Sequence, residues 1–155
     1  YLDMAFNSTK RLTRLLNDIL DLSRIEAGKM DINITEFEIK EVLQSVEDIL
    51  RHEAKQYNNS FSIDIEDNVP KKIICDSTRL TQILLNLAGN ALKYTQNGQV
   101  NLQAGLLPTS FKHSLRLLFI ISDTGQGIAD DQLDLIFEVF TQATDSGSVY
   151  NLKVG

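Results

Sequence analysis

Polar side chains recur at one-turn spacings within residues 86–94. At about 100° of rotation per residue, Asn86, Asn90 and Lys93 share one face of a helix. Asparagine is a mediocre helix former, so two of them a turn apart suggest a chemical role rather than a solvated face, although chance asparagines are the alternative. An amide oxygen is a hard ligand suited to Mg²⁺, and a lysine one turn further can contact a phosphate. The ring of Tyr94 could pack on a purine.

A second candidate begins where an apolar strand pattern ends at Asp123, with Gly125 and Gly127 following. A carboxylate only accepts hydrogen bonds, so Asp123 could accept one from the exocyclic amine of adenine. Glycines let the backbone pass close to a ligand, but two glycines this close together also form ordinary tight turns. The six-residue dinucleotide fingerprint is absent, because no third glycine follows at the required place.

The elements that must position these residues follow from hydrophobic periodicity. Helices are predicted over residues 2–27, 38–57 and about 77–94, the last capped by Asp76 or Ser77. Strands are predicted over residues 30–37, 61–65, 73–75, 99–106 and 115–122, with a helix or turn over 130–140 and a mobile loop over 141–155. This order predicts an α+β, two-layer sandwich: a mixed sheet with helices on one face, preceded by one long helix.

Finer expectations concern the core. The strand over residues 115–122 is apolar enough to be central, and Cys75 is expected to be an inert thiol in a buried strand. Asn97 and Gly98 form a strong hairpin signal, although a loop is also possible. Two of the predicted helices are expected to bury an apolar face. The face of the first consists of Ile39, Val42, Leu43, Val46, Ile49 and Leu50, and that of the second of Leu80, Ile83, Leu84, Leu87, Ala91 and Leu92.

The first helix has a long, narrow apolar stripe, and Gly28 is a plausible C-terminal stop. The residues of the stripe are Leu12, Leu15, Leu16, Ile19, Leu22 and Ile25. Periodicity alone leaves two interpretations open. The helix either lies on the core of its own domain or forms one arm of a helical hairpin or dimer.

The composition of the chain limits its domain number and its possible functions. The chain has 155 residues, 43% of them apolar, which suits one ordinary domain with a short appendage. A net charge of −6 argues against general nucleic-acid binding, which needs clustered basic residues. One cysteine excludes an intrachain disulfide and fits a reducing compartment. No apolar run is long enough to cross a bilayer, but the chain starts in mid-pattern and is expected to be a fragment, so any membrane anchor would lie in absent parts of the parent.

Taken together, the two motifs resemble the catalytic domain of sensor histidine kinases, whose nucleotide-binding fold is shared with gyrase, the ninety-kilodalton heat-shock chaperones and the mismatch-repair ATPases. Residues 79–95 are similar to that family's N box, residues 123–128 to its first glycine box and residues 137–140 to its F box. Residues 15–28 are similar to the second helix of the dimerisation hairpin and its linker. The resemblance therefore implies a hairpin helix and linker over 1–28 and a catalytic ATP-binding domain over 29–155, truncated in or after the ATP lid.

The resemblance also implies roles. Asn90 would coordinate Mg²⁺, Asn86 would line the phosphate site, Lys93 would contact phosphate, and Tyr94 would pack near the base or ribose of ATP. Asn86 stands where the ATPase relatives typically have a glutamate that activates water; an amide cannot act as a base, which suits a kinase. Asp123 would bind the adenine amino group.

The remaining implied site residues lie in the two later boxes. Gly125 and Gly127 would shape the adenine pocket, with Ile128 beside them in the ATP site. Phe137 and Phe140 would anchor the flexible lid. The implied partners are a response-regulator receiver domain and a second copy of the chain, joined through the N-terminal hairpin in a cytoplasmic protein.

The chain departs from the family pattern in three places. No phospho-acceptor histidine motif is present, since His52 lacks the rest of that motif and His113 lies in a polar connection. The second glycine box is absent, because the chain ends near its expected start. Gln142 occupies a position where many relatives have an arginine that faces phosphate.

Three functions follow as hypotheses. The leading one is the core of a histidine kinase that uses Mg·ATP and, in the intact protein, phosphorylates a histidine for relay to a regulator aspartate; this fragment alone would be inactive. The second is a nucleotide-deficient dimerisation or interaction module with a vestigial pocket. The third, a chaperone- or gyrase-type ATPase, is disfavoured by Asn86 and the leading helix.

Overall fold

The structure is a computed structural model that describes residues 2–112, 114–133, 141–142 and 150–151. Its main elements are α1 (Leu2–Glu26), β1 (Thr35–Glu38), α2 (Ile39–Gln56), β2 (Ser60–Ile65), β3 (Lys72–Cys75), α3 (Ser77–Tyr94), β4 (Gln99–Leu107) and β5 (Arg116–Asp123). A short 3-10 helix, η1 (Asp130–Gln132), and two short strands, β6 (Thr141–Gln142) and β7 (Tyr150–Asn151), follow.

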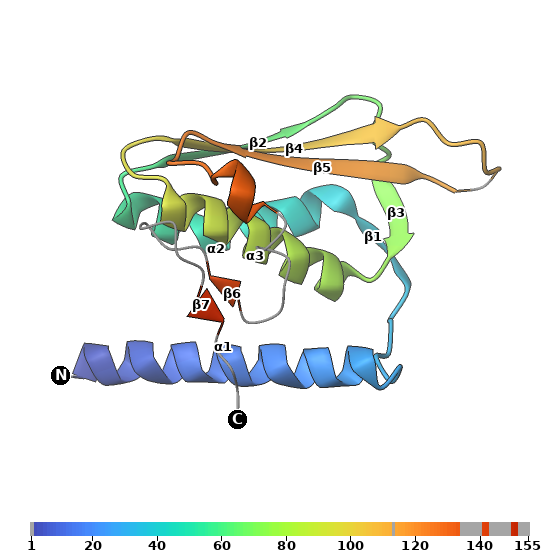
Figure 1. Cartoon of the computed structure of the whole chain (residues 1–155). Helices are drawn as coiled ribbons and strands as arrows, with labels where there is room; N and C mark the ends of the chain where they lie inside the picture. Colours follow the sequence, from blue (N-terminus) through green and yellow to red (C-terminus); the bar gives the residue numbers. More distant parts are fainter. Residues whose placement is uncertain (1, 113, 134–140, 143–149, 152–155) are drawn as a thin grey trace.

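The main sheet is mixed, and the helices α2 and α3 lie on one of its faces (Figure 1). Its strand order is β2-β4-β5, with β2 parallel to β4 and β4 antiparallel to β5. A separate antiparallel pair joins β1 to β3, and β6 pairs with β7. The predicted α+β, two-layer architecture is confirmed, with α1 running below the helical layer as an additional long helix.

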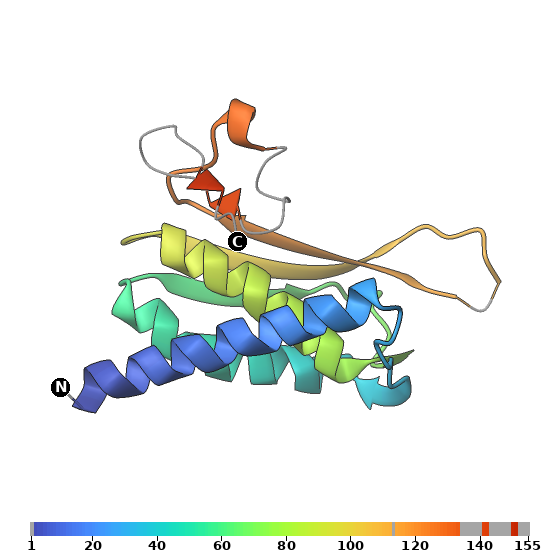
Figure 2. The ribbon, with the colours of Figure 1, turned by 60° about the horizontal axis from the view of Figure 1, so that its bottom comes forward.

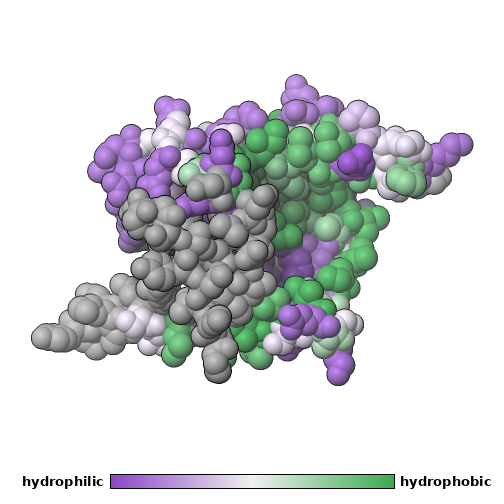
Figure 3. Space-filling model, in the orientation of Figure 1, coloured by the Kyte–Doolittle hydropathy of each residue, from purple (hydrophilic) through white to green (hydrophobic). Residues whose placement is uncertain are grey.

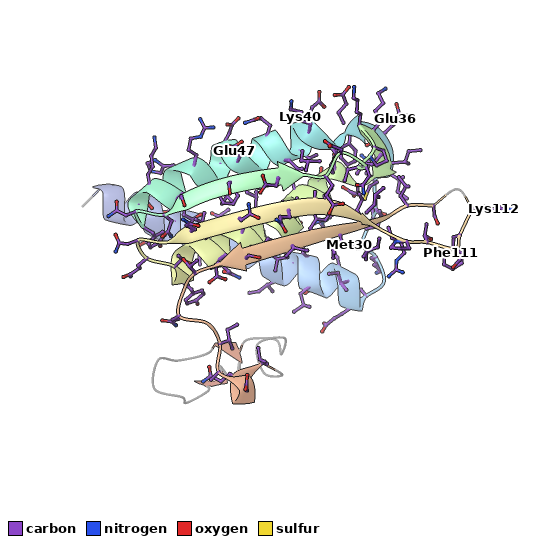
Figure 4. The ribbon with its side chains drawn as sticks, turned by 90° about the horizontal axis from the view of Figure 1, so that it is seen from above. Met30, Glu36, Lys40, Glu47, Phe111 and Lys112 are labelled. Carbon is purple, nitrogen blue, oxygen red and sulfur yellow. The ribbon has the colours of Figure 1, made fainter. Side chains whose placement is uncertain are left out.

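The core fills the space between the two helices and the inner face of the sheet. Strand alternation sends every second residue of β4 inward, where Val100 and Leu102 are fully buried. Leu43 and Val46 of α2 and Leu84 of α3 meet them. The outer face is more polar, and Figure 4 looks onto it; Phe111 and Lys112 lie at the tip of the β4–β5 connection, at the end of the sheet away from the C-terminus of β5.

The prediction of a buried side chain is wrong for three residues. Ile49, Ile83 and Leu87 are 56%, 54% and 51% exposed. The buried stripe of α3 is centred on Ala88, so Ile83 and Leu87 lie beyond its edge. Ile49 similarly lies just outside the buried arc of α2.

The strand predictions also need correction. The first strand begins at Thr35 rather than near residue 30, and β4 rather than β5 is central among the described strands. Cys75 is exposed, because β3 pairs only with β1 and buries only Ile73. Asn97 and Gly98 lie between α3 and β4, so their turn is not a hairpin. Of the helix or turn predicted over 130–140, only residues up to 133 lie in the described part.

Candidate functional site

The helix α3 begins at a side-chain cap, and it carries two candidate amides, the half-buried Asn86 and the exposed Asn90. The Oδ1 atom of Asp76 accepts a hydrogen bond from the Arg79 N–H at 3.0 Å, as predicted for a capping residue. The buried residues of α3 include Leu84 and Ala88, which face the core. Asn90 is exposed and lies on the side of the helix away from them. The polar face of α3 therefore points away from the sheet.

The last turn of α3 holds a cation beside an aromatic ring. The Nζ atom of Lys93 donates to the Tyr94 hydroxyl at 3.3 Å and lies 4.9 Å from the ring centroid. Both side chains are exposed, so this local contact leaves the ammonium open to an anion.

The C-terminus of α3 meets the end of β5 at Asp123. The Asp123 Oδ1 atom accepts hydrogen bonds from the Gly125 N–H at 2.9 Å and from the Thr95 hydroxyl at 3.5 Å. Within the described part of the chain, no donor engages the Oδ2 atom. One oxygen of this exposed carboxylate thus fixes the loop, and the other remains available to a ligand that donates a hydrogen bond.

Gly125 lies against the backbone of α3. A Cβ atom at this position would approach the Tyr94 carbonyl oxygen at 2.5 Å and both the Asp123 Oδ1 and Thr95 Oγ1 atoms at 2.9 Å. Glycine is therefore required by close contact here. Gly127 is different: a Cβ would meet nothing within 4 Å, but its φ of +71° favours glycine. Ile128 follows with an exposed side chain.

Two residues that were not predicted as site residues, Asn59 and Thr95, hold the C-terminus of α3 in place. The side chain of Asn59 donates to the carbonyl oxygens of Leu92 at 3.0 Å and Thr95 at 2.8 Å, and accepts from the Gly98 N–H at 3.0 Å. Thr95 is fully buried. In the sequence, an asparagine shortly after a helix indicates only that the helix ends. The role of Asn59 could not be predicted, because its partners lie more than thirty residues away.

The structure does not show the other candidate residues in this cluster. Phe137 and Phe140 fall outside the described residues, as does His113. His52 is exposed on α2, with one ring nitrogen 3.4 Å from the Gln56 amide. Among the residues that the structure describes, no cluster of three His, Cys, Asp or Glu side chains could hold a metal ion.

A groove of about 390 Å³ lies at another place in the fold. Residues of β1, α2 and the start of α3 line it: Phe37, Glu41, Val42, Ser45, Ser77, Thr78 and Thr81. None of the candidate residues lines it, so this groove is separate from the cluster around Asp123.

The model of the histidine kinase-, DNA gyrase B-, and HSP90-like ATPase family matches residues 75–154, which include both motifs and the loop that joins Asp123 to Gly125. The chain belongs to this ATPase family. Its matched segment begins one residue before the cap of α3, so this family's region covers every candidate site residue.

Curated relatives of this ATPase-family chain are sensor kinases. The chain is 38% identical to hybrid signal transduction histidine kinase K of Dictyostelium discoideum, over 88% of the chain and 12% of that protein. It is also 38% identical to the sensory/regulatory protein RpfC of Xanthomonas campestris pv. campestris, over 88% of the chain and 19% of that protein. The chain thus spans less than a fifth of the length of these relatives.

Solved structures of histidine kinases have the same fold as this ATPase-family chain. ShkA, solved full-length in complex with AMPPNP, gives a TM-score of 0.75 and 33% identity, covering 85% of this chain and 27% of that one. AdeS of Acinetobacter baumannii gives a TM-score of 0.69 and 26% identity, covering 83% of this chain and 61% of that one. No helix among the described residues is both long and apolar enough to cross a membrane.

Proposed function

We propose that this chain is the ATP-binding catalytic part of a sensor histidine kinase and that it binds Mg·ATP between α3 and the loop after β5. The observation that carries the proposal is the convergence of Asp123, Thr95 and Gly125 at the C-terminus of α3. The resemblance of residues 1–28 to a hairpin helix supports a division into that helix and an ATP-binding part over 29–155.

The adenine would lie at Asp123. With Oδ1 occupied by Gly125 and Thr95, the Oδ2 atom would accept a hydrogen bond from the exocyclic amine of adenine. Gly125 would let the loop approach α3 closely, and Gly127 would turn it. Ile128 would contribute apolar surface to the base.

The phosphates would lie along the polar face of α3. Bound Mg²⁺ would neutralise phosphate charge, and the hard amide oxygen of Asn90 suits it as a ligand. Phosphate oxygens of the nucleotide and water would be the other ligands of the ion. Lys93 would add a positive charge to the phosphate site, and Tyr94 would pack near the base or ribose.

The reaction assigned to the whole protein is transfer of the γ-phosphoryl group to a histidine nitrogen, followed by relay to an aspartate of a response regulator. Asn86 would line the phosphates without acting as a base, so positioning rather than water activation would dominate. Phe137 and Phe140 would anchor a lid. A homodimer formed through the N-terminal hairpin and a cytoplasmic setting belong to the same proposal.

Calorimetry with Mg·ADP tests the site. We expect Asn90→Ala and Asp123→Asn each to weaken binding at least about tenfold, or about 1.4 kcal/mol. Gln103→Ala is the matched control, since this exposed amide lies on β4, outside the site. The measurements should use this chain and a chain extended beyond Gly155. If the Asn90→Ala variant bound Mg·ADP as tightly as the unsubstituted chain, the assignment of Asn90 to the site would be rejected.

The vestigial-pocket alternative receives no support from the comparisons, whose relatives are kinases. It would be revived if neither form of the protein bound Mg·ADP.

A further inference from the structure

The strands β4 and β5 extend past the rest of the main sheet as a two-stranded arm, which consists of residues 105–118. The pairing of β2 with β4 ends at Ile65 and Ala104, whereas β4 and β5 stay paired as far as Leu107 and Arg116. At about 3.4 Å per residue, the paired part of the arm extends about 10 Å past the end of β2. Figures 1 and 2 agree that its tip projects beyond the helices and beyond β1 and β3 at that end of the molecule.

The root of the arm is fixed to the body of the domain. Leu106 and Leu117 lie opposite each other on the two strands, and both are partly buried and packed against the core. On the other face, a Cβ atom at Gly105 would lie 2.7 Å from the Glu66 Oε1 atom, so this carboxylate covers the backbone at the root. The arm is therefore a defined extension of the sheet, and its one neighbouring carboxylate among the described residues lies at its root.

The apolar side chains of the arm are more exposed toward its tip. Leu118 is 37% exposed, Leu115 is 53% exposed and Phe111 is 74% exposed. Figure 4 places Phe111 and Lys112 together at the tip, and Figure 3 shows hydrophobic side chains over β5, beside the grey atoms. The phenyl ring of Phe111 therefore contributes little to the core of the chain.

The arm has a charge opposite to that of the whole chain. The chain has a net charge of −6, but no Asp or Glu occurs between Asp76 and Asp123. The arm carries the exposed cations Lys112 and Arg116, and neither forms an ion pair with any described residue. Its tip is therefore complementary to an anionic surface.

The small size of the arm favours a lipid surface over a protein. A specific protein interface commonly uses about 20–30 residues a side, which is more than the whole arm contains. A bilayer needs no matching shape, accepts apolar side chains at its headgroup boundary and attracts cations when its lipids are anionic. The projection of about 10 Å is close to one Debye length at physiological salt, so repulsion between the acidic body and the lipids would be largely screened.

We propose that the arm binds the surface of an anionic lipid bilayer. Phe111 enters the headgroup region, and Lys112 and Arg116 contact lipid phosphates. One ring and two cations give weak, reversible binding, so the arm orients the chain on a membrane rather than anchoring it. This contact does not rest on the proposed nucleotide site, because the arm lies at the end of the sheet away from Asp123 (Figure 4).

Tryptophan fluorescence of Phe111→Trp tests the contact on the full chain, which has no other tryptophan. We expect the emission to move to shorter wavelength with vesicles of phosphatidylcholine and phosphatidylglycerol, because the ring leaves water, and to stay almost unchanged with phosphatidylcholine alone. Salt at about 1 M, where the Debye length is only about 3 Å, should reverse most of the shift. Adding Lys112→Gln and Arg116→Gln should lower the partition coefficient at least about tenfold, since each cation near an anionic surface contributes about fivefold.

Matched variants outside the arm make the test specific. Lys40→Gln with Lys55→Gln removes two exposed cations from α2 and should change the partition coefficient by less than about twofold. In vesicle flotation without the tryptophan, Phe111→Ser should lower the bound fraction markedly. Ile74→Ser removes an apolar side chain that is 72% exposed and should leave the bound fraction unchanged. Circular dichroism verifies that every variant is folded.

Three results would overturn the proposal. The first is an unshifted emission of the folded Phe111→Trp chain with anionic vesicles. The second is an equal loss of vesicle binding in the arm variants and in the α2 variants. The third is an emission shift with polyglutamate but none with anionic vesicles, which would assign the arm to an acidic protein instead.

Discussion

Gly125 donates its backbone N–H to the Oδ1 atom of Asp123 at 2.9 Å, so the residue proposed to bind adenine also orders the loop that would surround it. The Thr95 hydroxyl shares that oxygen. Loop order and base recognition are therefore coupled through one carboxylate.

A methyl group at Gly125 tests this coupling. Gly125→Ala would place Cβ 2.5 Å from the Tyr94 carbonyl oxygen, and neither backbone can give way cheaply. We expect the loop to shift and Mg·ADP affinity, measured by calorimetry, to fall at least about tenfold, which is about 1.4 kcal/mol. Unaltered affinity would show that the loop does not form the base pocket.

Gly89→Ala is the matched control on α3. A Cβ there meets only ordinary contacts, at 3.8 Å from the Glu53 Oε2 atom and 3.9 Å from the Leu50 Cδ2 atom. Alanine is the better helix former, so the free energy of unfolding should rise by about 0.5–1 kcal/mol in urea titrations, with Mg·ADP affinity unchanged.

Asp123 should also select the base. Adenine presents an amine where guanine presents a carbonyl oxygen, which would face the carboxylate without a proton between them. We expect Mg·GDP to bind at least about 100-fold more weakly than Mg·ADP in calorimetry. Similar affinities for the two nucleotides would mean that another part of the loop faces the base.

Asn59 should be important for stability. Asn59→Ala removes three hydrogen bonds and leaves the Leu92 and Thr95 carbonyl oxygens without that donor. We expect the free energy of unfolding to fall by about 2–3 kcal/mol. Asn58→Gly is the control: Asn58 is exposed with a φ of 52°, so glycine should be close to neutral there.

Asp76 should make stability depend on pH. Hydrogen bonds from the N–H groups of Arg79 and Asn33 hold the pKa of this carboxyl below its usual value of 3.8. The charged form is favoured in the folded state, so its contribution is complete above about pH 5 and is lost as pH falls through the lowered pKa. The thermal midpoint of Asp76→Asn should therefore lie furthest below that of the parent near neutral pH, and the difference should shrink toward pH 3. A difference independent of pH would contradict this assignment.

Cys75 offers a rapid check on the edge strand. Because the thiol is exposed, a disulfide reagent should titrate it in the native protein as fast as in urea at the same pH, and Cys75→Ser should unfold at the same midpoint. If the native thiol reacted 100-fold or more slowly than the thiol in urea, the result would instead support the buried strand that the sequence predicts.

Local patterns predicted much of this architecture. Helices α2 and α3 match the prediction within one or two residues. Their apolar residues recur at the helical period, and Asp76 caps α3 by accepting a hydrogen bond from the Arg79 N–H. The same periodicity could not decide which flanking apolar residues are covered. Ile83 and Leu87 fit the pattern but lie beyond the edge of the layer that packs on the sheet.

The candidate site divides in the same way. Residue type alone predicts which groups are available, since Asp123 can accept a hydrogen bond, the asparagines can ligate a metal ion and the glycines permit close approach. Long-range packing, and no local pattern, brings the end of β5 to the C-terminus of α3, Asn59 to that end of the helix and Asp21 to Arg79. These pairs are separated by 28, 36 and 58 positions, and contacts over such distances depend on packing of the whole chain rather than on any local preference.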